Sequence, residues 1–479
     1  MCPTGQCKDI AVRVKKHDLH MRSSLLKTAF EIMGIGRKKP LTFGAYCLKT
    51  IDLSKTDSLL MHIRLRLTIL TFLQFFVWGA WLITIGTYCF NAKGWSGAEF
   101  GAIFSTLALS SIFMPPLTGI IADKWLNAEK LYGVLQICYG IVLFFVPQVN
   151  DPNTLYYVVF AAMIFYMPTI ALSYSIAYTV LKNNGYDVVK AFPPVRVWGT
   201  IGFIVAMWTT NLTGSKANAN QFIIGAVAAI ILGIYSFTMP ACKPERKIAS
   251  GTEWVSQLGL QAFRLFGQYK MALFFFFSLL LGAALQLTNM YGDAFLDDFK
   301  NQPVYADSFV VKYSTIILSI SQMSETLFIL TIPFFLNRFG IKNVMLFAML
   351  AWVLRFALFA WSDPTALGTV FIILSCIVYG MAFDFFNISG SLFVETTTDT
   401  SIRSSAQGLF MMMTNGVGAF LGSKLSGLVI DRYFMLPGGA KDWSNIWLAF
   451  AGYALVVAIL FVVLFKHKHQ RGSLQQVAH

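Results

Sequence analysis

Long apolar runs with few charges recur along the chain between residues 67 and 465. A helix needs about 20 such residues to cross a hydrocarbon core of about 30 Å. In lipid a lone segment pairs all its backbone groups only as a helix, and these runs lack the short alternating pattern of barrel strands. The pattern predicts an all-α polytopic membrane protein with twelve transmembrane helices, near residues 67–89, 98–122, 131–149, 155–181, 197–212, 221–240, 271–291, 309–336, 344–361, 367–388, 404–430 and 443–465.

The longest polar interruption between these runs follows the sixth one. It predicts two six-helix bundles, at 67–240 and 271–465, joined by a cytoplasmic linker at 241–270. A basic extension, 1–66, and a cytoplasmic tail, 466–479, flank them. The loop after the second helix carries Asp123 and Lys124, and the equivalent loop after the eighth carries Asn337 and Arg338. This echo indicates a parallel repeat and predicts a gating role for Asp123 and Arg338 at the helix ends.

Only 13% of the residues are charged, against about 25% in soluble domains. Eighteen of the 60 charged residues lie in 1–66, which excludes a disordered chain, a coiled coil or an ordinary cytosolic enzyme for the rest. With the N-terminus inside, the later cytoplasmic segments hold 16 Lys and Arg, and the outer loops hold six. This asymmetry predicts a multi-pass protein of the cytoplasmic membrane with both termini cytoplasmic, and explains the net charge of +14 without a nucleic-acid partner.

The extension 1–66 has no run long enough to span a bilayer and no signal-peptide pattern. We expect a poorly ordered basic tail, with Met61 as an alternative start of the chain. The seven cysteines are scattered and show no metal-ligand or disulfide spacing. We therefore expect no metal ion and no cofactor.

Polar side chains within three C-terminal spans are the strongest candidates for function. A charge in the bilayer interior costs at least about 2.5–3.5 kcal/mol on insertion scales. Two carboxylates, three amides and two aromatic residues recur there with helical spacing and predict one shared binding cavity: Gln286, Asn289, Gln322, Glu325, Tyr379, Phe383 and Asp384. The alternatives are interhelical hydrogen bonding by the amides and a structural ion pair of either carboxylate with Arg355.

The fifth span supplies a second candidate face. Pro193 and Pro194 are expected to end any preceding helix, so that a new helix begins after them. Arg196, Thr200 and Phe203 then share one face of the new helix. The arginine offers a fork of donors for a carbonyl or carboxylate, and its alternative role is an interfacial charge that reaches the headgroups. Gln74 in the first span is a weaker candidate.

Several of these segments resemble the bacterial nucleoside:proton symporters of the major facilitator superfamily. The resemblance rests on FLQFFVWGAWL (72–82), FPPVRVWGTIGF (192–203), LQLTNMYG (285–292), SISQMSETLFILTIPFFL (319–336), IVYGMAFDFFNISGS (377–391) and SAQGLFMMMTNG (405–416), and covers about 61–469. It implies proton-coupled nucleoside uptake by alternating access between two six-helix bundles, in the major facilitator fold. We expect the protein to function as a monomer. Its substrate-binding positions fall on Arg196, Thr200, Phe203, Gln286, Asn289, Gln322, Glu325, Tyr379, Phe383 and Asp384, with Asp384 and Glu325 as the proton-coupling pair.

Three other functions stay open at the level of the residues. A proton symporter for a sugar or another hydroxyl-rich solute would use the same amides and carboxylates, and base stacking on Phe203 or Phe383 would distinguish it. A membrane sensor or structural protein would tolerate Asp384→Asn. A membrane enzyme is disfavoured, because no nucleophile elbow, phosphate loop or metal-ligand motif is present.

Overall fold

The computed structural model describes residues 63–244, 260–399 and 402–466, which all belong to one compact unit, His62–His479. The N-terminal half begins with a helix at 63–79. It continues through α3 (Ile85–Thr87), the π-helix η1 (Tyr88–Ala92), α4 (Gly97–Lys124), α5 (Ala128–Leu143), the 3₁₀ helix η2 (Val146–Gln148), α6 (Pro152–Asn183), α7 (Val188–Leu212) and α8 (Asn220–Ser236).

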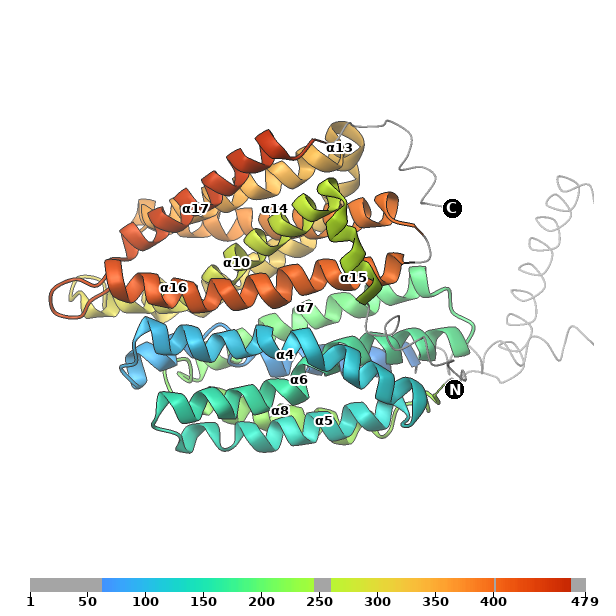
Figure 1. The fold of residues 1–479 in the computed structure, drawn as a ribbon. Coiled ribbons are helices and arrows are strands. Elements are labelled where there is room, and N and C mark those ends of the chain that lie inside the picture. The colour runs from blue at the N-terminus through green and yellow to red at the C-terminus, as the bar shows by residue number, and fades with distance from the viewer. Residues whose placement is uncertain (1–62, 245–259, 400–401, 467–479) are drawn as a thin grey trace, which may run out of the picture. The chain divides into compact units, whose positions relative to one another are not determined.

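The C-terminal half follows the 3₁₀ helix η3 (Leu260–Gly267), which lies in the predicted linker. Its elements are α10 (Tyr269–Asp298), η4 (Phe299–Asn301), α11 (Phe309–Lys312), α12 (Ser314–Leu318), α13 (Ile320–Ala360), α14 (Ala366–Thr397), α15 (Arg403–Met411), the π-helix η5 (Met412–Gly418), α16 (Ala419–Tyr433) and α17 (Trp443–Leu464). Figure 1 shows the helices of each half packed as a group, with α4 and α16 side by side at the junction.

Each of the twelve predicted spans contains helix, and the prediction of two six-helix bundles is confirmed. Eight described helices are long and apolar enough to cross a bilayer. One of them, 314–360, covers most of the predicted eighth and ninth spans, because α13 continues across a kink at Gly340. The φ of 77° there is a left-handed value that glycine adopts without strain. The first, sixth and eleventh spans correspond to the helix at 63–79, the 17-residue α8 and the run α15–η5–α16.

Three local predictions need correction. The first span is not continuous, because residues 80–84 form turns between the helix at 63–79 and α3. The eleventh contains the π-helix η5. The prediction that Pro193 and Pro194 end a preceding helix is wrong, since α7 begins at Val188. The amide of Ala191 already donates to the carbonyl of Asp187 (2.9 Å). Pro193 and Pro194 lie inside this helix, and each removes one backbone donor without ending it.

The predicted extension lies almost wholly outside the described residues, as do Met61, the middle of the linker (245–259) and nearly all of the tail. The domain boundaries therefore stay predictions.

Candidate functional site

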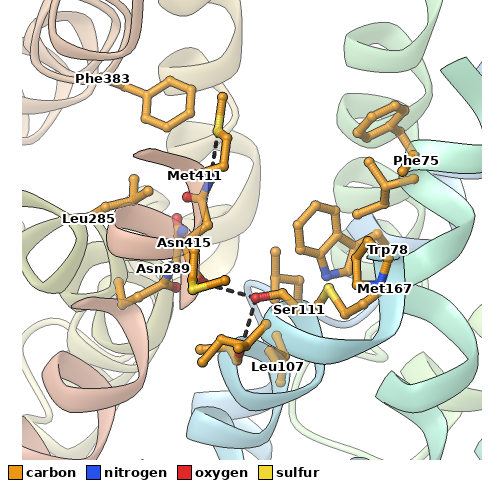
Figure 2. A pocket seen from close by; sticks show the side chains of 18 of the residues that line it. Phe75, Trp78, Leu107, Ser111, Met167, Leu285, Asn289, Phe383, Met411 and Asn415 are labelled. Atoms are coloured by element: carbon orange, nitrogen blue, oxygen red, sulfur yellow. Dashed lines mark hydrogen bonds between the residues drawn. The ribbon is translucent and has the colours of Figure 1, made fainter. Parts of the chain in front are cut away.

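A cavity of about 870 Å³ lies between the two halves. A volume of this size accommodates a small organic solute. Nine of the ten predicted substrate-binding residues line it: Arg196, Thr200, Phe203, Gln286, Asn289, Gln322, Glu325, Tyr379 and Phe383. In Figure 2, Asn289 and Phe383 lie on one side of the cavity, and Phe75 and Trp78 on the other.

The N-terminal wall is an aromatic surface with one guanidinium. The Cζ of Arg196 lies 4.2 Å from the centre of the Phe75 ring, and its Nε donates to the hydroxyl of Tyr174 (3.0 Å). Phe203 lies further along the same face of α7. Its ring packs edge-on against Trp78, with ring centres 6.4 Å apart. Because Arg196 faces the cavity and is held by two aromatic residues, the alternative of an interfacial charge is not supported.

The C-terminal wall carries the amides and a second aromatic surface. Gln286 and Asn289 come from α10, Gln322 and Glu325 from α13. On α14, the rings of Tyr379 and Phe383 lie parallel, with centres 5.8 Å apart and an interplanar angle of 2°. This wall therefore offers hydrogen-bond donors and acceptors beside a flat apolar surface, which suits a solute with both hydroxyl groups and an aromatic ring.

The two carboxylic acids occupy different environments. Glu325 lines the cavity. Asp384 is only 4% exposed, and its Oδ2 has no hydrogen-bond partner among the described residues. The two groups interact electrostatically, and the charge of Arg196 attracts both. Asp384 thus lies within reach of the charged groups of the cavity without being part of its lining.

Arg355 pairs with neither carboxylate in the described part of the chain. Its guanidinium donates to the carbonyl of Ser375 (2.7 Å) and to the hydroxyl of Ser321 (3.4 Å). The structural ion pair considered from the sequence is therefore not formed, and neither Glu325 nor Asp384 has an ion pair among the described residues of the C-terminal half.

Several cavity residues were missed by the sequence analysis, because aromatic and small polar residues are common in any membrane helix. Phe75, Trp78 and Tyr174 line the N-terminal wall. Ser111 on α4 donates to the backbone carbonyl of Asn415 in η5 (3.1 Å), a contact between the halves that Figure 2 shows. Asn415 lies within the π-helix η5, an element that the sequence does not predict.

Gln74 does not line the cavity. It is fully buried in the N-terminal half, where its side chain bonds with Thr169 (3.0 Å), Tyr132 (2.5 Å) and Gln136 (2.8 Å). Its role is therefore in packing rather than in the candidate site.

The halves are joined by polar contacts at the end that carries the loops 213–219 and 434–442. We call this the closed end, formed by Thr87, Asn91, Gly97, Ala98 and Lys216 with Asp293, Asp297 and Asp431. The hydroxyl of Thr87 donates to Asp293 (2.5 Å), and Lys216 forms an ion pair with Asp297 (2.7 Å). Asn91 also donates to Asp297 (2.6 Å). The cavity, in contrast, reaches Phe263 of η3 and Ser405 of α15, toward the opposite end.

Lys441 adds a contact of a different kind at the closed end. Its Nζ lies 3.8 Å from the centre of the Phe90 ring in the other half. Burial lowers the pKa of this amine, while the neighbouring charges of Asp298 and Asp431 oppose the shift.

The predicted gating pair is not tested by these contacts. Asp123 falls in the last turn of α4, but its side chain is outside the described part of the structure. Arg338 is exposed, two residues before the kink at Gly340.

Comparison with known proteins identifies a family whose substrates suit this cavity. Residues 61–470 match the family model of the nucleoside H⁺ symporters. The chain belongs to this family. It is 50% identical to the nucleoside permease NupG of Escherichia coli over 421 residues, which cover 88% of this chain and 100% of that one. It is 52% identical to the xanthosine permease of the same organism over 418 residues, 87% of this chain and 99% of that one.

The fold comparison agrees. The crystal structure of the nucleoside transporter NupG superposes with a TM-score of 0.80, covering 85% of this chain and 100% of that chain. This nucleoside H⁺ symporter therefore has the major facilitator fold, spans a membrane and couples nucleoside transport to protons. The sugar-symporter and sensor alternatives are set aside by the family.

Proposed function

We propose that this symporter imports nucleosides across the cytoplasmic membrane, as a monomer with both termini in the cytoplasm, and that the ten predicted residues bind substrate and proton. The observation that supports this most directly is the cavity between the halves, which brings Arg196 and Phe203 of one half opposite the amides and Glu325 of the other. Under the predicted orientation, the closed end faces outward and the cavity faces the cytoplasm.

The two walls suit the two parts of a nucleoside. Amides and a carboxylate match ribose hydroxyl groups, which both donate and accept. The faces of Phe203 and of the Tyr379–Phe383 pair suit the flat base. The relatives at 50% and 52% identity are named a nucleoside permease and a xanthosine permease, so a common nucleoside such as uridine and xanthosine itself are the substrates to try first.

The two carboxylic acids divide the work in this proposal. Glu325, in the cavity lining, contacts the nucleoside. Asp384, buried behind the lining with an unpaired oxygen, binds the coupled proton. A buried, unpaired negative charge is unfavourable, and protonation of Asp384 neutralises it. The positive charge of Arg196 favours the ionised carboxylate and so the release of the proton. Asp123 and Arg338 act at the cytoplasmic helix ends as gating residues.

Uptake of labelled uridine and xanthosine into proteoliposomes tests the proposal, with and without an inward proton gradient. Asp384→Asn is expected to abolish gradient-driven accumulation while nucleoside exchange at zero gradient continues. Glu325→Gln is expected to raise the half-saturation concentration in both assays. Asp307→Asn, at a side chain that is 94% exposed, is the control and should resemble the unchanged protein. Full gradient-driven accumulation by Asp384→Asn would contradict the assignment.

A further inference from the structure

Arg355 is a buried cation outside the cavity lining. It lies in the second part of α13 and is 3% exposed. In the described part of the chain it forms no ion pair with a carboxylate, and its Nε has no hydrogen-bond partner. Ionisable side chains in membrane helices are rare because burying them is unfavourable, and they commonly mark functional positions. The contacts of Arg355 indicate what that position does.

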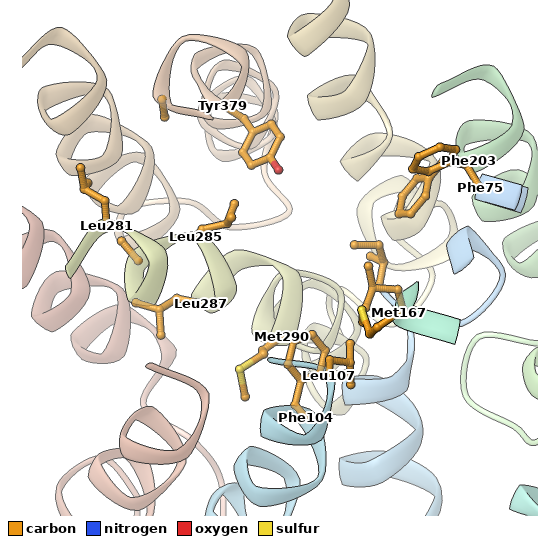
Figure 3. Packing of buried hydrophobic residues seen from close by; sticks show 14 of the residues in the cluster. Phe75, Phe104, Leu107, Met167, Phe203, Leu281, Leu285, Leu287, Met290 and Tyr379 are labelled. Carbon is orange, nitrogen blue, oxygen red and sulfur yellow. The ribbon is translucent and has the colours of Figure 1, made fainter. Parts of the chain in front are cut away.

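The guanidinium lies against the aromatic wall of the cavity. Its Cζ is 4.5 Å from the centre of the Tyr379 ring, a cation–π contact, and 5.3 Å from that of Phe359. Tyr379 lies parallel to Phe383 and meets Trp352 edge-on, with centres 5.9 Å apart and an angle of 88°. Figure 3 shows Tyr379 directed toward the side on which Phe203 and Phe75 lie. Arg355 therefore touches the hidden side of a ring that lines the cavity.

The same guanidinium joins α13 and α14, which carry Gln322, Glu325, Tyr379 and Phe383 of the C-terminal wall. It donates to Ser321, which precedes Gln322 on α13, and to the carbonyl of Ser375, one turn before Tyr379 on α14. The hydroxyl of Ser375 donates back to the carbonyl of Arg355 (3.0 Å). Moving either helix relative to the other changes these bonds, so the arginine couples the position of Gln322 to that of Tyr379.

We propose that Arg355 is a positioning residue for nucleoside binding, which acts through the ring of Tyr379. The inference rests on the proposed site, and concerns a residue that touches neither the cavity nor the substrate. The cation holds the Tyr379 ring parallel to Phe383, so that the wall is already arranged when the nucleoside enters. A wall that must order on binding gives weaker binding, because the ordering opposes association.

Equilibrium uridine exchange, with no proton gradient, tests the proposal in proteoliposomes. Arg355→Met, which keeps an unbranched apolar stem and removes the charge and donors, is expected to raise the half-saturation concentration about tenfold. The maximum exchange rate per folded transporter should stay within about twofold. Arg355→Lys keeps the cation and loses the planar group of donors. Its half-saturation concentration should lie between those of the unchanged protein and Arg355→Met.

The decisive comparison repeats Arg355→Met in two backgrounds. In Tyr379→Phe, which keeps the ring, the loss of affinity should persist at about tenfold; in Tyr379→Leu, which removes the ring, it should shrink to less than about twofold. Equal losses in both backgrounds, or no loss with Arg355→Met alone, would overturn the proposal. If Arg355→Met fails to reach the membrane, the same pair of backgrounds is compared with Arg355→Lys. Gradient-driven accumulation by the unchanged protein reports separately on the proposed function.

Discussion

Asp431 on α16 caps the first turn of α4 in the other half. It accepts a hydrogen bond from the backbone amide of Gly97 (2.8 Å). It accepts a second from the amide of Ala98 (2.6 Å). A carboxylate at the start of a helix is favoured both by these free amides and by the helix dipole. Because the cavity reaches the other end of the molecule, this contact has to break whenever the closed end opens.

Asp431→Asn is expected to shift the protein toward a state that is open at this end. The amide has no charge and only one accepting atom, so about 1–3 kcal/mol of the contact is lost, which corresponds to a change in population of about 5- to 150-fold. The measurement is the labelling rate of Ser111→Cys, a cavity position, by a membrane-impermeant thiol reagent added at the closed end. Labelling should become several-fold faster, whereas Asp307→Asn should leave it unchanged. An unaltered rate with Asp431→Asn would show that other contacts keep this end shut.

The crossing of α4 and α16 leaves no room for a side chain. A Cβ atom on Gly427 would lie 2.0 Å from the backbone carbonyl oxygen of Gly97, which is much too close for any real contact. Gly427→Ala is therefore expected to separate the two helices, lower uridine uptake more than about tenfold and accelerate Ser111→Cys labelling from the closed end.

Gly452→Ala is the matched control for this glycine. A Cβ atom there meets nothing within 4 Å, so uptake and labelling should resemble those of the unchanged protein. Normal uptake by Gly427→Ala would mean that transport does not require α4 and α16 to approach as closely as they do in this structure.

The sequence predicts elements and local faces much better than it predicts contacts between the halves. Arg196, Thr200 and Phe203 were placed on one face by helical spacing alone, and they do line the cavity together. The start of their helix was misplaced, because a proline pair in the early turns resembles a helix stop. Spacing also could not separate Glu325 from Asp384, since only the packing of α13 against α14 puts one in the lining and the other behind it.

The closed end could not be predicted at all. Thr87 and Asp293 are 206 positions apart in the chain, and Gly97 and Asp431 are 334 apart. Each of these residues has an ordinary local explanation as a helix-end or loop residue. Their pairing follows from how two bundles meet, which no periodicity encodes.

Phe203→Ala is expected to weaken nucleoside binding selectively. The ring lines the cavity and is held edge-on by Trp78, so its face is available for a base. Stacking of aromatic pairs contributes about 0.5–1.5 kcal/mol, so the half-saturation concentration for uridine should rise roughly 2- to 10-fold. Inhibition of uptake by the free base should weaken in parallel. Phe237→Ala, at a ring that is 47% exposed, should change neither. A selective loss of ribose-dependent affinity instead would place the sugar, not the base, at Phe203.

Gln74→Leu is expected to destabilise the fold without changing the substrate site. Besides its side-chain bonds to Thr169, Tyr132 and Gln136, its backbone carbonyl accepts from Tyr166 (3.0 Å). Leucine leaves the Tyr132 hydroxyl without its acceptor, and an unpaired buried polar group costs about 1–3 kcal/mol. The Gln136 amide loses one of its two acceptors and keeps the hydroxyl of Thr169 (3.0 Å). Tm of the detergent-solubilised protein should fall by several degrees, while the half-saturation concentration of the remaining folded transporter should not change.

Gln322→Leu is the counterpart in the cavity lining and should give the opposite result. The oxygen of Gln322 already lacks a hydrogen-bond partner among the described residues, so its removal costs the empty protein little. Its loss should instead raise the half-saturation concentration, because the nucleoside loses a partner in the bound state. If Gln74→Leu changed affinity and Gln322→Leu changed only Tm, the division between the buried amide cluster and the binding cavity would be wrong.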